Sequence, residues 1–253
     1  MNSINWARVA AQAVYYFTAA VALGGPHRPI SFSVPTGNFG DILAGWVAKK
    51  MGLPIDRLMI GTNANDILAR TLTTGTYEMK GVEATTSPSM DIQISSNFER
   101  LLFEAYDRDG EAIRRLMANL NQSRSFTIDA EPLARIREEF SATAVDEANV
   151  ADEMAQTYRS TGYVLDPHSA VGTRAGRALL KQKPEVPVVA LSTAHPAKFP
   201  DAVERATGIR PALPPHMADL MERKESFTVL PNDQSAVERF IRERARAVKG
   251  VAA

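Results

Sequence analysis

The sequence of 253 residues contains no cysteine. Disulfides, thiolate zinc sites, iron–sulfur clusters and cysteine nucleophiles are therefore excluded. Net charge is absent as well, because 29 Lys and Arg residues are balanced by 29 Asp and Glu residues. A neutral chain has no overall attraction to nucleic acid or to anionic lipid, so we expect neither as a partner. Any anion that the protein binds must be held by a local site.

Several common catalytic motifs are also missing. The chain has no G-x-x-x-x-G-K-[ST] loop, no G-x-G-x-x-G loop, no G-x-S-x-G elbow and no H-E-x-x-H pair. Its four histidines, His27, His168, His195 and His216, lie far apart in the sequence. We therefore predict no metal site.

No hydrophobic run is long enough to cross a membrane. Residues 9–25 are apolar and follow Arg8, which loosely imitates a signal peptide, but Gln12 and Thr18 interrupt the run. Their apolar positions recur with a helical period, and Asn2 or Ser3 could cap the start, so the segment predicts a core helix. Secretion and membrane anchoring are the alternatives. Without them we expect a cytoplasmic location.

Apolar runs of strand length then alternate with helical patterns. We predict strands over 29–34, 57–61 and 187–191, and helices over 41–51 and 66–74. This alternation is typical of an α/β protein with an open, mostly parallel sheet and crossover helices.

Between residues 98 and 162 the pattern becomes helical, with apolar stripes on Leu133, Ile136 and Phe140 and on two further segments. We interpret 98–162 as a helical insertion between a segment over 1–97 and a remainder over 163–253. The remainder ends in a Pro-rich loop at 210–216 and an amphipathic helix, and no clear interdomain linker appears. The predicted apolar face of that helix consists of Val237, Phe240, Ile241 and Val248.

The most informative stretch is P-T-G-N-F-G-D at 35–41, between a predicted strand and a predicted helix. Its two glycines allow successive backbone N–H groups to point into one concavity, and the helix start adds N–H groups and a positive dipole end. The candidate phosphate-binding residues are Gly37, Asn38, Phe39, Gly40 and Asp41. An ordinary β–α turn is the alternative interpretation, because Gly and Asn are common turn residues.

Five stretches together resemble the threonine synthases, in the order of that family. They are S-I-N-W-A-R (3–8), Y-Y-F (15–17), P-T-G-N-F-G-D (35–41), D-P-H-S-A-V-G (166–172) and S-T-A-H-P-A-K-F (192–199). The resemblance covers essentially the whole chain. It implies a tryptophan-synthase-like fold and pyridoxal 5′-phosphate as cofactor, and a reaction of O-phospho-L-homoserine with water to give L-threonine and phosphate.

The resemblance also implies roles for particular residues. The residues of 37–41 match family positions that line the cofactor, mostly through backbone groups on its phosphate, and Thr193 matches the hydroxyl that faces the pyridine nitrogen. Such a hydroxyl is a neutral partner of that nitrogen. The alternative for Thr193 is a satisfied polar residue at the end of a strand.

Other polar residues allow two interpretations. Asn63, Asn65 and Asp66 follow a strand and could cap a helix or border the site. The loops at 87–91 and 95–97 could border the substrate or serve as caps. We interpret His168 as a core histidine.

The chain departs from the family in one respect. In threonine synthases the Schiff-base lysine lies upstream of the N-W-A-R segment, in an F-K-D motif, and no lysine here, Lys198 included, has that context. We therefore assign no catalytic residue and expect an incomplete fold with uncovered apolar surface, which is inactive without the missing N-terminal half. The alternatives are a non-catalytic phosphate- or cofactor-binding remnant and an amino-acid dehydratase of the same fold type.

Overall fold

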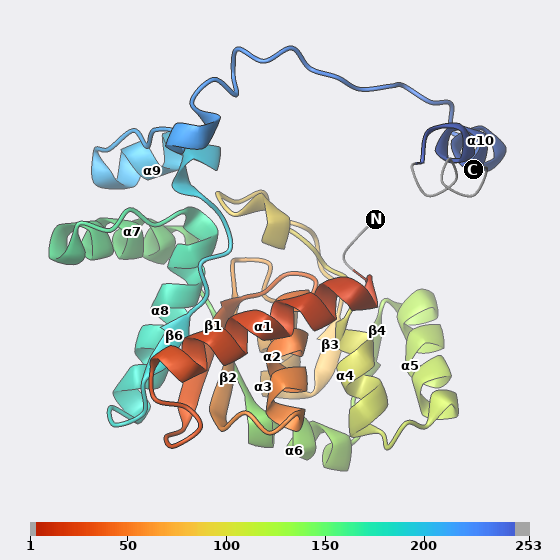
Figure 1. Cartoon of the computed structure of the whole chain (residues 1–253). Coiled ribbons are helices and arrows are strands. Elements are labelled where there is room, and N and C mark those ends of the chain that lie inside the picture. The colour runs from red at the N-terminus through yellow and green to blue at the C-terminus, as the bar shows by residue number, and fades with distance from the viewer. Residues whose placement is uncertain (1–3, 246–253) are drawn as a thin grey trace. The chain divides into compact units, whose positions relative to one another are not determined.

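A computed structural model describes residues 4–245, and the chain divides into two compact units, with the boundary in the sequence between Pro211 and Ala212 (Figure 1). The second unit contains a short 3₁₀ turn at Pro215–Met217 and helix α10 (Gln234–Arg244). The predicted amphipathic helix is therefore present, although Val248 lies outside the described residues. The division into 1–97, 98–162 and 163–253 stays a prediction.

The first unit is built on a parallel sheet, which confirms the predicted α/β class. Its strand order is β5-β2-β1-β6, with β1 (Ile30–Pro35) and β2 (Ile55–Thr62) at the centre. The edge strands are β5 (Phe140–Ala144) and β6 (Val188–Ala190). All six residues of β1 are buried, as expected of a central strand with both faces covered.

Helices cover both faces of this sheet (Figure 1). The Ser33 hydroxyl donates to the Gly172 carbonyl of α8 (Pro167–Gln182) at 2.6 Å, whereas the neighbouring Phe32 packs against Tyr16 of α1 (Trp6–Ala22) on the other face. A small antiparallel pair, β3 (Thr76–Glu78) and β4 (Ser125–Thr127), stands apart from the main sheet. The α-helices of the first unit are α1 (Trp6–Ala22), α2 (Gly40–Lys50), α3 (Ile67–Thr74), α4 (Phe98–Ala105), α5 (Gly110–Ser123), α6 (Ala130–Glu139), α7 (Glu147–Thr161), α8 (Pro167–Gln182) and α9 (Pro200–Thr207), and its 3₁₀ turns are η1 (Pro88–Met90) and η2 (Pro196–Lys198).

The segment over 98–162 differs from the purely helical expectation. It contains α4 to α7, but it also supplies β4 and the edge strand β5. Phe140 continues the apolar spacing of Leu133 and Ile136, yet α6 ends at Glu139 and Phe140 begins β5. The reason is that the Phe140 ring is buried beside the ring of Phe39, and its backbone pairs with β2.

The contact between α1 and α2 depends on a glycine. Tyr16 of α1 is fully buried, and its ring lies directly against Gly45 of α2. A Cβ atom at Gly45 would lie 2.4 Å from Tyr16 Cε1, far inside van der Waals contact. The predicted core helix is thus confirmed, with Asn5 as its N-cap in place of the earlier candidates. Among residues 4–245, every helix is too short or too polar to cross a bilayer.

We predict that Gly45→Ala destabilises the protein, although alanine is intrinsically the better helix residue. The added Cβ atom would meet two atoms of the buried Tyr16 ring, so an overpacking cost of about 3 kcal/mol is expected. The helix-propensity gain of about 1 kcal/mol leaves a net loss in the free energy of unfolding of about 2 kcal/mol. Urea unfolding measures the effect. The control is Gly110→Ala at the start of α5, where the added Cβ meets only Arg114 Nη1 at 3.6 Å. Equal stability of Gly45→Ala and the parent would contradict this packing.

Candidate functional site

A cleft of about 760 Å³ lies where β1 and β6 end. Parallel α/β sheets bind ligands at the carboxyl ends of their strands, so this is the position at which a site is expected. One wall comes from α1, through Arg8, Gln12 and Tyr15, which are not among the residues predicted from the sequence to form a site. The cleft brings together all six predicted cofactor-binding residues: Gly37, Asn38, Phe39, Gly40, Asp41 and Thr193.

Phe39 contributes backbone to this cleft. Its φ angle is 62°, which lies in the left-handed region, and its side chain is 1% exposed. The ring packs against Phe98 and Phe140, with centroid distances of 5.3 and 5.8 Å. This anchoring of the ring in the core stabilises the unusual φ angle.

The loop at 36–41 is tight enough to require glycine. A Cβ atom at Gly37 would lie 2.8 Å from the carbonyl oxygen of Ser89. Helix α2 begins at Gly40, within this stretch, and its N-cap residue Phe39 makes no side-chain capping bond. The first-turn N–H groups of α2 therefore lie at the cleft together with the positive end of the helix dipole. Backbone donors of this kind fit a phosphate group.

Asp41 is the ionisable residue of this loop. The Tyr16 hydroxyl donates to the Asp41 carbonyl oxygen at 2.8 Å and lies 3.3 Å from its Oδ1. Burial raises the pKa of Asp41 to about 6, against the opposing effects of the Tyr16 hydrogen bond and the charge of Arg8. Burial, followed by the charge of Asp41, raises the pKa of Tyr16 well above its usual value.

Thr193 is held in the cleft through its backbone. Its N–H donates to Ser169 Oγ at 3.3 Å, and this hydroxyl in turn donates to the carboxylate of Asp166. Asp166 also caps helix α8 by accepting from the N–H groups of His168 and Ser169. The exposed side chain of Thr193 lines the cleft, and its role toward a pyridine nitrogen stays a prediction.

His168 is buried and both of its ring nitrogens face protein groups. Nδ1 lies 3.1 Å from Asp166 Oδ1, and Nε2 accepts the N–H of Ser89 at 3.4 Å. A neutral imidazole with its proton on Nδ1 satisfies both contacts. His168 therefore connects α8 to the η1 turn, as a structural histidine does.

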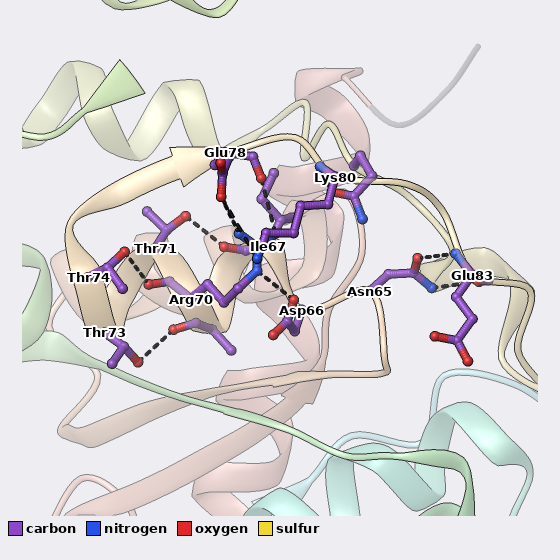
Figure 2. A network of polar contacts seen from close by, with 12 residues as sticks. Asn65, Asp66, Ile67, Arg70, Thr71, Thr73, Thr74, Glu78, Lys80 and Glu83 are labelled. Carbon is purple, nitrogen blue, oxygen red and sulfur yellow. Dashed lines mark hydrogen bonds and ion pairs between the residues drawn. The ribbon is translucent and has the colours of Figure 1, made fainter. Parts of the chain in front are cut away.

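The polar residues after β2 tie down a neighbouring segment. Asn63 and Asn65 are buried, and both side-chain amides donate to Asp91 Oδ1, at 2.8 and 3.0 Å. Figure 2 shows the side chain of Asn65 paired with the backbone of Glu83, to which it makes two hydrogen bonds of 2.9 Å. Asp66 stands at the N-cap of α3, but its side chain binds Arg70 at 2.7 Å and makes no capping bond.

Among the residues that the structure describes, no three His, Asp or Glu side chains are grouped as metal ligands. Lys198 lines the cleft beside Thr193, and its Nζ lies 5.7 Å from the ring centroid of Phe199.

Comparison with solved structures defines the class. The structure of a PLP-bound threonine synthase from Brucella melitensis is 58% identical, with a TM-score of 0.88, and the match covers 97% of this chain and 53% of that chain. A yeast threonine synthase structure is 39% identical, with a TM-score of 0.84 over 96% of this chain and 53% of that one. The chain thus has the fold of the tryptophan-synthase-like pyridoxal phosphate enzymes.

Sequence comparison narrows the class to one family. The threonine synthase of Pseudomonas aeruginosa is 48% identical over 250 residues, which are 98% of this chain and 53% of the relative. A family model described as "Threonine synthase, C-terminal" matches residues 169–241. The chain belongs to the threonine synthase family, and it spans about half the length of the relatives that it matches. The resemblance drawn from the sequence motifs is confirmed.

We predict that the raised pKa of Asp41 makes its ionisation unfavourable for folding. Between the ordinary carboxyl pKa near 4 and the folded value of about 6, the folded state binds more protons than the unfolded state, so stability falls as the pH rises. Asp41→Asn is therefore expected to gain stability relative to the parent as the pH goes from 4 to 7, by at most about 3 kcal/mol.

Urea unfolding at several pH values measures this difference. The control is Asp201→Asn, because the carboxylate of Asp201 is exposed and pairs at the surface with Arg210. Its difference from the parent is expected to stay nearly constant with pH. A constant difference for Asp41→Asn as well would contradict the unfavourable ionisation.

Proposed function

We propose that the chain supplies the cofactor-phosphate-binding portion of an enzyme that converts O-phospho-L-homoserine and water to L-threonine and phosphate. The observation that carries the proposal is the match with a PLP-bound threonine synthase over 97% of this chain. The glycine-dependent loop at the start of α2 independently fits a phosphate.

The residues of the cleft have distinct tasks in this proposal. Backbone N–H groups of the loop and of the first turn of α2 bind the phosphate of pyridoxal 5′-phosphate, which requires no basic side chain. Thr193 would offer a neutral hydroxyl to the pyridine nitrogen, where a carboxylate would favour its protonated form. When bound, the cofactor acts as the electron sink that acidifies C–H bonds of the amino-acid substrate.

In this proposal the site is completed by the N-terminal portion of the relatives, which this chain does not match. That portion supplies the Schiff-base lysine, since Lys198 stands at a different motif position. Exposed apolar residues on α1 support a covering partner, because Val14, Tyr15 and Val21 are 57–65% exposed and Tyr15 also lines the cleft. Soluble monomers rarely leave such a surface uncovered. A cytoplasmic location stays a prediction from the sequence.

We expect the chain alone to form no threonine from O-phospho-L-homoserine. Joined to the N-terminal portion of the Pseudomonas aeruginosa relative, it is expected to form threonine and phosphate in equal amounts, because both parts of the site are then present. Threonine is measured by chromatography and phosphate by a colorimetric assay.

Three results would revise this proposal. Steady threonine formation by the chain alone would contradict the assignment of the Schiff-base lysine to the other portion of the enzyme. An inactive fusion whose chain still binds pyridoxal 5′-phosphate would favour the non-catalytic remnant. Release of a 2-oxo acid in place of threonine would favour the dehydratase.

Gly37→Ala is expected to weaken binding of pyridoxal 5′-phosphate at least about tenfold, since the Cβ atom collides with the Ser89 carbonyl and displaces the loop. Equilibrium dialysis of the fused protein measures the affinity. The matched control is Gly81→Ala, because a Cβ atom at Gly81 meets no atom within 4 Å. Unchanged binding by Gly37→Ala would remove the loop from the proposed site.

A further inference from the structure

We infer that Ser95 and Asn97 are positioning residues of the phosphate loop, which they hold from the side opposite the cleft. The inference rests on the proposed function, because it assigns these residues to the site that binds the cofactor phosphate. Over 95–97 the sequence predicts either a substrate border or helix caps. Asn97 does stand at the N-cap position of α4, but its side chain makes no capping bond and contacts the phosphate loop instead.

Ser95 holds the carbonyl of Gly37. Its Oγ donates to the Gly37 oxygen at 2.7 Å, and the side chain is only 4% exposed. The backbone N–H of Ser95 donates to the hydroxyl of Tyr77 at 2.8 Å, which fixes the residue from behind. Tyr77 itself is stacked between Phe98 and Phe126, with interplanar angles of 12° and 4°.

Asn97 holds the next carbonyl along the loop. Both its backbone N–H and its Nδ2 donate to the Asn38 oxygen, at 3.1 and 2.9 Å. Asn97 is fully buried at the start of α4. Two donors on one carbonyl oxygen fix the direction of that peptide group more strongly than one donor would.

These contacts determine where the N–H groups of the loop point. In a trans peptide the C=O and N–H bonds lie in one plane and point in opposite directions. With the Gly37 oxygen held by Ser95, the N–H of Asn38 points to the other side of the loop. With the Asn38 oxygen held by Asn97, the same follows for the N–H of Phe39. Asn38 and Phe39 both line the cleft, so we infer that their N–H groups point toward it.

The anchors also remove an electrostatic obstacle. A carbonyl oxygen turned into the cleft would repel an anion, and a loop of Gly and Asn has the freedom to turn in that way. Ser95 and Asn97 stabilise the orientation that a phosphate needs before it binds. The segment that carries them is held in turn, because Asp91 Oδ1 accepts hydrogen bonds from Asn63, Asn65 and Thr85.

The test uses ¹⁵N-labelled full chain titrated with inorganic phosphate, with the amide resonances of Asn38 and Phe39 as readout. Phosphate is expected to shift both amides in the parent. Ser95→Ala is expected to weaken phosphate binding roughly fivefold and to reduce chiefly the Asn38 shift. Asn97→Ala is expected to reduce chiefly the Phe39 shift. Each variant is thus expected to affect the resonance of a different amide, and a general loss of structure would not produce this selective pattern.

Two controls separate positioning from folding. Ser95→Thr keeps the hydroxyl and is expected to retain parental affinity. Ser96→Ala removes a hydroxyl whose contact is with the Asn38 side chain, at 3.4 Å, and leaves both backbone carbonyls anchored. Ser95→Ala removes a single oxygen atom, so it tests the inference even where Asn97→Ala fails to fold.

Variants that bind phosphate as the parent does would overturn the inference, as would a parent whose two amides do not respond to phosphate. Threonine formation by the fused protein is measured separately. A responsive loop in a fusion that makes no threonine would leave the positioning role standing and overturn the proposed reaction.

Discussion

The close approach of two backbone segments determines the geometry of the cleft. Gly37 lies against the carbonyl of Ser89, with no room for a side chain, and the residues that follow η1 hold the loop from behind. The loop follows β1 and leads into α2. The contact between Gly37 and Ser89 therefore couples the positions of the sheet, the helix and segment 87–97. A phosphate site made of backbone depends on such packing in a way that a site made of flexible basic side chains does not.

The charge balance of the chain is consistent with this design. With 29 basic and 29 acidic residues, there is no overall field to attract an anion. Asp41 is the ionisable residue of the loop, and its pKa is raised by burial although the charge of Arg8 lowers it. Recognition of a dianion then rests on directed N–H groups and on the dipole of α2.

Sequence alone predicted the parts of the fold that short-range patterns determine. The strands β1 and β2 are apolar runs bounded by Pro and Gly, and α2 follows with a regular apolar face, so their periods were visible. Phe140 was misassigned because helix α6 and strand β5 both accommodate its spacing, and only the rings beside it decide. Helix α8 was missed, although Asp166 before Pro167 is a typical helix start.

The residues of the candidate site likewise differ in whether a local sequence pattern reveals them. The loop at 37–41 could be found from its glycines, but Thr193 joined it only through the resemblance to a family. The loop at 95–97 stood out as polar, but the anchoring role of Ser95 and Asn97 could not be assigned, because their hydrogen bonds reach 58 and 59 residues back along the chain. A serine and an asparagine in a polar segment carry no local sign of a partner at that distance.

Helix α1 contributes to the core, to the cleft and to the exposed surface, so ligand binding in the cleft and association with a covering protein involve the same helix. Tyr16 packs on α2, Arg8 and Gln12 line the cleft, and Val14 and Val21 are exposed to solvent. A protein surface that covers the outer side of α1 therefore bears on the same rigid element that forms a wall of the cleft. If covering α1 improves the affinity of the cleft for its ligand by some factor, thermodynamic reciprocity requires that the ligand strengthen the association by the same factor.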